Sequence, residues 1–241
     1  MTDTNQAEKS MPAGMFDIAI NILTSPTEAF NELRLRPSKL FPLAVIVLST
    51  AAVMFWYFTV VDFDWYIDDT LSVRDLTEEQ TEAAREQMTS MSQSTFRLIS
   101  TLGSAFGILI VYILQAGYFS LTSAISGSGQ KFGHWFSLVL WTGLPYILSV
   151  VGMIVTLSLS PNGQLAAYDL DPLTLANLGL QSNNSSLMTV FQNINLTMMW
   201  SLALTVMGYK QWIECSILKA LAVVLAPYAV IMLIGVSFAL A

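Results

Sequence analysis

The chain has 241 residues, of which 54% are hydrophobic and 11% are charged, whereas soluble domains average about 25% charged residues. A mean hydropathy of +0.58 therefore excludes an ordinary soluble domain and favours a helical bundle in lipid. The net charge is −7 without a basic patch, so we expect no nucleic-acid partner, and the single cysteine, Cys215, excludes an internal disulfide.

The N-terminal segment is predicted to lie at the membrane surface. Residues 1–14 are polar, and we expect a flexible cytoplasmic tail. In residues 15–23, apolar side chains leave only Asp17 and Asn21 as a narrow polar strip. This pattern is typical of an amphipathic helix that lies in the membrane interface.

A second short helix is predicted to begin at residues 25–28, Ser-Pro-Thr-Glu. Ser25 would be the N-cap, and Glu28 would close a capping box. The helix would end near Arg36, which would pair with Glu32. The face expected to contact the membrane consists of Ala29, Phe30 and Leu33. The equally favoured alternative is that both short helices dock on the bundle.

Apolar stretches of about 20 residues predict membrane-spanning helices. They are residues 40–61, 98–125, 134–160, 187–207 and 220–241. The predicted fold is therefore all-α: one polytopic transmembrane bundle of five helices over residues 15–241, preceded by the interfacial amphipathic helices.

Residues 62–97 form the one long hydrophilic segment, and it is acidic. We expect a helix to begin near Thr77, where Glu78 and Glu79 complement the positive end of the helix dipole. Carboxylates are ligands for hard cations, but their spacing here fits no calcium loop. We therefore predict a solvated external loop and no metal site. The carboxylates considered as ligands are Asp62, Asp64, Asp68 and Asp69.

Basic residues predict the orientation, because they concentrate on the cytoplasmic side of membrane proteins. Five spans with a cytoplasmic N-terminus place most basic residues inside and leave the C-terminus external. The inner set is Lys9, Arg34, Arg36, Lys39, Lys131, Lys210 and Lys219, and the outer set is Arg74, Arg85 and Arg97.

Small and polar residues recur at helical spacing in the third predicted span and would share one face. Such a seam lets another helix pack closely or lines a pore, and the absence of charge in every span favours packing. Pro145 predicts a kink. In the second span, Gly103 and Gly107 form a GxxxG pair, which also predicts close helix packing. The seam consists of Thr142, Pro145, Ser149, Gly152 and Thr156.

Two further polar strips run along the second and fourth predicted spans. They would either line a polar cavity or form hydrogen bonds between helices, each of about 0.6 kcal/mol. The strip of the second span is Gln115, Tyr118 and Thr122, and that of the fourth is Asn193, Thr197 and Ser201. A weak repeat is also visible, because residues 144–146, Leu-Pro-Tyr, resemble residues 226–228, Ala-Pro-Tyr.

The sequence contains no recognisable catalytic motif. His134 is the only histidine, and its place at a membrane boundary is typical of an interfacial side chain. An ion-coupled transporter normally carries a charged residue inside its spans, and the predicted spans have none. We therefore expect neither an enzyme nor a cofactor.

Three stretches resemble the Yip family (Ypt/Rab-interacting protein) of five-span membrane proteins. They are residues 23–30, LTSPTEAF; residues 131–136, KFGHWF, leading to Leu144-Pro145; and residues 200–204, WSLAL. The resemblance implies an integral membrane protein with a cytoplasmic N-terminus and no known enzymatic activity. The short tail, which lacks an Asp-Leu-Tyr-Gly-Pro motif, and the long acidic loop resemble the bacterial branch. This implies the bacterial inner membrane and no Rab-type GTPase partner.

The expected function is accordingly non-enzymatic: partner binding or membrane organisation. The expected partners are the lipid bilayer and either another membrane protein or a second copy of the chain. The alternative function is a channel or carrier for a small solute or ion, which would use the two polar strips.

Overall fold

The computed structural model describes residues 14–73, 76–160 and 162–239. Most of the predicted N-terminal tail lies outside these residues. Within them every regular element is helical, which confirms the all-α prediction. The helices are α1 Met15–Thr24, α2 Pro26–Leu35, α3 Leu40–Val60, α4 Phe63–Ser72, α5 Glu78–Thr89, α6 Gln93–Ile125, α7 Phe132–Thr142, α8 Tyr146–Leu159, a 3₁₀ turn η1 Ala167–Asp169, α9 Ser185–Asn193, α10 Leu196–Ile213 and α11 Ile217–Ala239.

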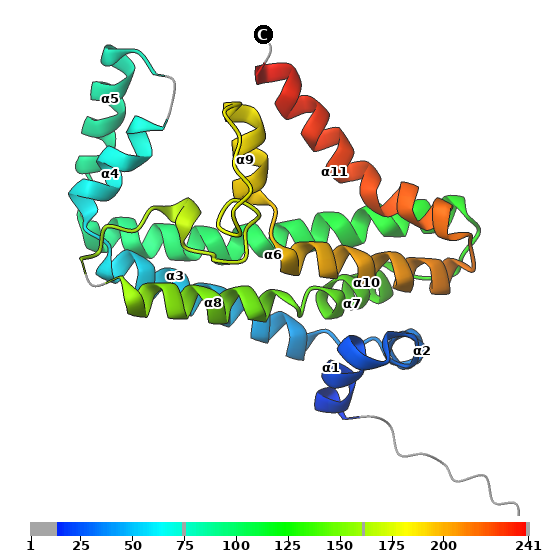
Figure 1. The fold of residues 1–241 in the computed structure, drawn as a ribbon. Coiled ribbons are helices and arrows are strands. Elements are labelled where there is room, and N and C mark those ends of the chain that lie inside the picture. Colours follow the sequence, from blue (N-terminus) through cyan, green and yellow to red (C-terminus); the bar gives the residue numbers. More distant parts are fainter. Residues whose placement is uncertain (1–13, 74–75, 161, 240–241) are drawn as a thin grey trace, which may run out of the picture.

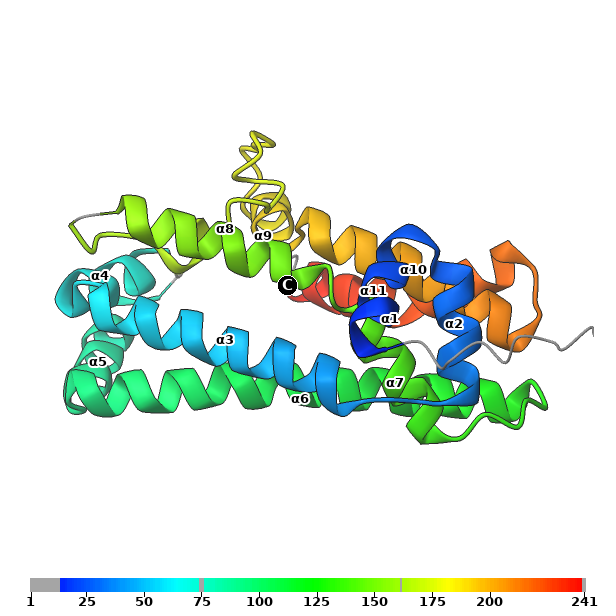
Figure 2. The same cartoon turned by 90° about the horizontal axis from the view of Figure 1, so that it is seen from below.

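The long helices form an elongated bundle (Figures 1 and 2). Helices α3, α6, α7, α8 and α10 run along its long direction, with α1 and α2 at one end and α4 and α5 at the other. Helices α9 and α11 leave the bundle on one side (Figure 1). The bundle therefore separates the short N-terminal helices from the acidic segment.

Among the described residues, two helices, α3 and α6, are long and apolar enough to cross a membrane, and α7 with α8 adds a third span if the bent pair counts as one. The pair bends by 41° at its break. Pro145 lies in this break, lacks an amide hydrogen and cannot continue the helix, which confirms the predicted kink. The number of five spans stays a prediction.

The prediction of one continuous helix over residues 187–207 is wrong. Helix α9 ends at Asn193, and α10 begins at Leu196. Asn195 has extended backbone angles, and its side chain caps α10 by accepting a hydrogen bond from the Met198 amide at 2.7 Å. An asparagine favours such a cap over a helix interior, so the expected strip of polar residues is interrupted after Asn193.

Helix α2 docks on the bundle, and its predicted membrane-facing side is wrong. Ala29, Phe30 and Leu33 are at most 1% exposed. They pack in the core with residues of α7 and α10. The apolar face of α2 is thus covered by protein, as the docking alternative required.

Two local predictions for α2 also fail. The expected capping box is not formed, because the Ser25 amide already donates to the Asn21 carbonyl at 2.8 Å and closes α1. The expected pair of Glu32 with Arg36 is replaced by Arg34 and Glu214, whose charged atoms lie 3.5 Å apart. Docking on α10 therefore decides which arginine is paired.

The acidic segment is folded into α4 and α5. A helix begins after Thr77 as predicted, and the Thr77 and Gln80 side chains cap each other's amides. Arg85 of α5 forms an ion pair with Asp68 of α4. Asp62 caps α4 by accepting from the Trp65 amide at 3.1 Å. The described residues contain no group of three or more His, Cys, Asp or Glu side chains placed to hold a metal ion.

One hydrophobic core cluster lies at the end of the bundle near α1 and α2. Five aromatic side chains, which we call the aromatic core, are each at most 2% exposed there. The ring centroid of Trp135 lies 5.3 Å from that of Trp212 and 5.4 Å from that of Tyr209. The aromatic core consists of Phe30, Phe119, Trp135, Tyr209 and Trp212. It joins α2, α6, α7 and α10 into one unit.

Candidate functional site

A polar cavity lies where α6, the break between α7 and α8, α10 and α11 meet. Its volume is about 220 Å³, and its lining contains no charged side chain. The cavity opens here because α7 ends at Thr142 and α10 begins only at Leu196. The polar residues that line it are Tyr112, Gln115, Thr142, Tyr146, Asn195, Thr197, Ser201, Thr205 and Tyr228.

The break between α7 and α8 supplies one wall of the cavity. A Cβ atom at Gly143 would collide with the hydroxyl of Tyr112, so only a glycine lets this tyrosine approach the backbone. Pro145 is buried beside it, and Tyr146 faces the cavity. The kink thus brings two tyrosines to the same space.

Asn195 is fixed at the start of α10 from both sides. Its amide oxygen accepts from the Thr197 hydroxyl at 2.9 Å, and its amide nitrogen donates to the Asp171 carboxylate at 2.7 Å. Asp171 is only 6% exposed. The segment after α8 therefore folds back onto the bundle and holds Asn195 in place.

The seam of the third span faces α10 and this returning segment. The hydroxyl of Ser149 lies 2.9 Å from that of Thr197, and the hydroxyl of Thr142 lies 2.9 Å from that of Thr205. A Cβ atom at Gly152 would lie 2.8 Å from the Pro172 side chain. The neighbour of Gly152 is thus the returning segment rather than a helix.

The remaining seam residue and the GxxxG pair make fewer contacts. Thr156 donates to the Gly152 carbonyl of its own helix at 3.1 Å. Added Cβ atoms at Gly103 and Gly107 would meet no described atom within 4 Å. A packing role for these two glycines stays a prediction, and it requires a helix from outside the chain.

The three residues of the polar strip of the second span make three different kinds of contact. The Gln115 amide donates to the Tyr228 hydroxyl at 3.2 Å and lines the cavity. Tyr118 donates to the Val223 carbonyl at 2.9 Å. Thr122 donates to the Phe119 carbonyl of its own helix at 3.1 Å. Only Gln115 therefore reaches the polar cavity.

Pro227 explains why Tyr118 finds an acceptor on α11. In a regular helix the Val223 carbonyl would accept from the amide of residue 227. Proline has no amide hydrogen, so this carbonyl is free for the Tyr118 hydroxyl. The proline thus creates the bond that ties α6 to α11.

The structure brings together Gln115, Thr197 and Ser201, as the cavity alternative required. Asn193 does not line this cavity, and its amide donates to the Thr189 carbonyl of α9 at 2.8 Å. It lines a second polar pocket, which shares Asn195 with the cavity. The sequence did not predict Tyr112 and Asn195 as cavity residues. The repeat of Leu-Pro-Tyr and Ala-Pro-Tyr was a signal for two others, because its tyrosines, Tyr146 and Tyr228, both line the cavity.

An apolar groove adjoins the cavity between α6 and α11, which diverge along their length (Figure 1). Its volume is about 490 Å³. Val111, Gln115 and Tyr228 line both the groove and the polar cavity, so the two spaces are neighbours. The other groove residues are Leu114, Tyr118, Phe119, Val224, Ala226, Pro227, Val230 and Ile231.

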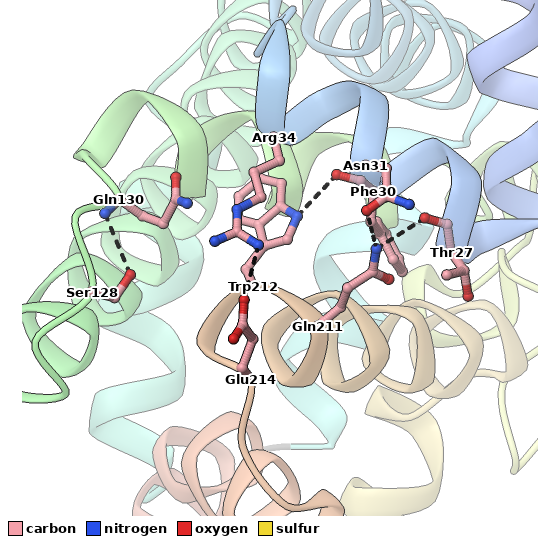
Figure 3. A network of polar contacts seen from close by, with 9 residues as sticks. All are labelled: Thr27, Phe30, Asn31, Arg34, Ser128, Gln130, Gln211, Trp212 and Glu214. Atoms are coloured by element: carbon pink, nitrogen blue, oxygen red, sulfur yellow. Dashed lines mark hydrogen bonds and ion pairs between the residues drawn. The ribbon is translucent and has the colours of Figure 1, made fainter.

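A separate polar network holds α2 on the end of α10 (Figure 3). The Trp212 indole donates to the Phe30 carbonyl at 3.0 Å. The Gln211 amide donates to the Thr27 carbonyl at 3.0 Å and to the Asn31 side chain at 2.7 Å. Two of these bonds use backbone carbonyls of α2 and one uses a side chain, so the position of this helix is fixed by several independent contacts.

The other end of the bundle carries a cluster of acidic groups. Tyr168 donates to the Asp69 carboxylate at 3.3 Å. Burial and the nearby Asp69 charge both raise the pKa of the Asp169 carboxyl above its ordinary value. Burial and the same charge raise the pKa of Tyr168. The segment after α8 therefore meets α4 through groups that repel one another when ionised.

Comparison with known proteins identifies a family. The family model described as Yip1 domain matches residues 20–239. No curated protein and no solved structure matches the chain.

Proposed function

This chain belongs to the Yip family, and from that premise we propose that it is a non-enzymatic integral membrane protein that organises the bilayer around α1. The observation that carries the proposal is the environment of this helix. Ile18 and Ile22 are at most 5% exposed and attach α1 to the bundle. A neighbouring face of the same helix remains apolar and exposed.

The exposed face of α1 is suited to lie among lipid headgroups. Its residues share one side of the helix, and Asp17 and Asn21 lie on another. A docked helix with such a face occupies area in one leaflet only, which favours bending or ordering of the bilayer. The exposed apolar residues are Met15, Phe16, Ile20 and Leu23.

Charge supports a cytoplasmic position for the α1–α2 end. Lys39 lies beside the start of α7, because a Cβ atom at Gly133 would lie 2.9 Å from its ammonium nitrogen. Lys131 precedes the same helix, and Lys210 lies in the last turn of α10. With the acidic α4 and α5 at the opposite end, the positive-inside rule favours a cytoplasmic N-terminus and, with five spans, an external C-terminus. We propose the bacterial inner membrane as the location.

The test is remodelling of vesicles that contain the purified full chain. The double variant Phe16→Ser/Ile20→Ser removes the exposed apolar face, while Val73→Ser changes an exposed apolar residue at the opposite end. We expect the wild type and Val73→Ser to deform vesicles seen by electron cryomicroscopy, and the double variant to leave them round. Equal deformation by all three proteins, or none by the wild type, would contradict the proposal.

The polar cavity favours a second candidate function, a channel or carrier for a small uncharged solute. Its hydroxyl and amide groups can replace the water around such a solute. Flux of glycerol into vesicles that contain the protein tests this function. Flux that Ser201→Val abolishes would establish transport, whereas vesicles no more permeable than protein-free ones would exclude it.

Partner binding is the remaining form of the proposed function. The partner is another membrane protein or a second copy of the chain, which would pack on the open face at Gly103 and Gly107. Crosslinking in native membranes, followed by identification of the linked chains, tests this form. Links that Gly103→Ile removes would support it.

A further inference from the structure

We propose that the polar cavity and the apolar groove form one binding site for a neutral glycerolipid such as a diacylglycerol. The acyl chain would lie in the groove between α6 and α11, and the hydroxyl and ester groups would enter the cavity. This inference is independent of bilayer organisation by α1, because it uses other helices and other residues.

The first support is that the two spaces adjoin and differ in the types of residue that line them. Gln115 and Tyr228 stand at their boundary and are joined by a hydrogen bond of 3.2 Å. Most lining residues of the cavity carry a hydroxyl or amide group, although the surface that they expose is mainly apolar, and the lining of the groove is almost wholly aliphatic and aromatic. An amphipathic ligand matches this division, whereas a purely apolar helix would leave the polar groups unmatched.

The second support is the absence of charge. None of the side chains that line either space is charged. A phosphate group placed there would lose its hydration without gaining an ionic partner, which is costly. Neutral hydroxyl and carbonyl groups need only hydrogen bonds. The site therefore favours a lipid without a charged headgroup.

The third support is the supply of free polar groups in the cavity. Within the part of the chain that the structure describes, the hydroxyl of Ser201 makes no hydrogen bond, and the hydroxyl of Tyr112 packs against the backbone at Gly143 without making one. Both residues line the cavity, and they come from α6 and α10. Its volume of about 220 Å³ greatly exceeds the space that one water molecule needs. These groups are placed to bind a ligand with several polar atoms.

The fourth support is access from the lipid. Helix α11 is attached to the bundle by the buried Ala220 and Val224, but Val230 and Ile231 are 53% and 68% exposed. On the facing helix, Leu114 is 66% exposed. The groove is thus open along the side of the bundle, where lipid chains replace water. A lipid can enter sideways without crossing the aromatic core.

The test uses the full chain in phosphatidylcholine vesicles and a diacylglycerol with a photoreactive diazirine in one acyl chain. After irradiation, mass spectrometry maps the labelled residues. We expect labels concentrated on the groove residues of α6 and α11, and we expect unlabelled diacylglycerol to compete whereas phosphatidylglycerol does not. Labelling spread evenly over all lipid-facing helices, or equal competition by phosphatidylglycerol, would overturn the proposal.

Three variants separate the groove from the cavity. Ala226→Trp fills the groove, and Leu102→Trp adds the same side chain at a lipid-facing position of α6 outside it. Ser201→Ala removes a cavity hydroxyl with little change in volume. We expect Ala226→Trp to abolish the labelling, Leu102→Trp to leave it unchanged and Ser201→Ala to weaken binding about fivefold, as loss of one hydrogen bond implies.

Melting in detergent shows whether each variant is folded. If Ala226→Trp does not fold, Ser201→Ala decides the outcome. Unchanged diacylglycerol affinity of folded Ser201→Ala would overturn the role of the polar cavity. Loss of binding in folded Leu102→Trp would show that the label reports the general surface rather than the groove.

Discussion

The aromatic core and the polar cavity differ in how completely side chains fill them. In the aromatic core large rings fill the space, and the indole of Trp212 donates to the Phe30 carbonyl. The Trp135 indole nitrogen and the Tyr209 hydroxyl are buried there without a hydrogen-bond partner among the described residues. At the polar cavity a space of about 220 Å³ remains between the side chains. The first region is therefore closed by packing, and the second has room for a ligand.

The course of α11 explains the difference. Near the aromatic core, α2, α6, α7 and α10 surround the large rings on all sides. At the cavity the fourth side is α11. Hydrogen bonds from Gln115 and Tyr118 of α6 attach it to the bundle, and beyond them the two helices diverge (Figure 1). Substitutions in the aromatic core should therefore affect stability most, and those at the α6–α11 junction should affect the open site.

The largest loss of stability is expected for Trp212→Ala. This side chain is 2% exposed, its ring centroid lies 5.3 Å from that of Trp135, and its removal leaves a cavity and removes the hydrogen bond to the Phe30 carbonyl. Loss of a large buried aromatic residue costs about 3–5 kcal/mol. The matched control is Trp200→Ala, because Trp200 is 39% exposed. Thermal melting in detergent measures both, and equal melting temperatures would show that the aromatic core does not hold the bundle together.

An intermediate loss is expected for Gly152→Leu. The new side chain would collide with Pro172 and displace the segment that carries Asp171, and overpacking of this kind costs about 1–3 kcal/mol. Gly103→Leu is the control, since no described atom lies near it. If Gly103→Leu lowered stability more than Gly152→Leu in membranes but not in detergent, the result would show that a partner helix packs on α6.

A smaller loss is expected for Tyr118→Phe, which removes the hydroxyl that binds the Val223 carbonyl. Hydrogen bonds between membrane helices contribute about 0.6 kcal/mol on average. Pro227→Ala should restore an amide donor for that carbonyl, so Tyr118→Phe should cost less in the Pro227→Ala background. A double-mutant cycle measured by unfolding in dodecyl sulfate gives the coupling. Additive effects would show that Pro227 and Tyr118 act separately.

The smallest effect is expected for Asp169→Asn and depends on pH. Because the folded-state pKa of Asp169 is raised, its contribution to folding is fully present below the unfolded pKa and is lost as pH rises through the folded pKa. Asn stays neutral, so the variant should hold the segment after α8 against α4 equally well at pH 4 and pH 7. Hydrogen exchange of residues 165–170 measures this. An identical pH response in the two proteins would contradict a raised pKa of Asp169.

Periodicity and caps predicted much of the fold. The helical class, the start of a helix at Thr77 and the bend at Pro145 depend on local chemistry, namely apolar length, capping side chains and a missing amide. The membership of α2 in the core could not be predicted in this way. Its apolar face looks the same whether lipid or α10 covers it.

The site was only partly predictable for a similar reason. The polar strips indicated Gln115, Thr197 and Ser201, because they recur at helical spacing. Asn195 and Asp171 were missed, since their role depends on a segment that folds back over a long sequence distance. Asn193 belongs to α9 and lines a separate pocket with Asp171 and Asn195. The strict four-residue step concealed the break before α10.

The most direct measurement is a structure of the full chain in lipid nanodiscs by electron cryomicroscopy, with diacylglycerol added. We expect a closed aromatic core, and we expect density that runs from the groove between α6 and α11 into the polar cavity beside Gln115 and Ser201. If helix α11 packed along α6 and protein side chains filled both the groove and the cavity, the structure would contradict the distinction between a closed aromatic core and an open site.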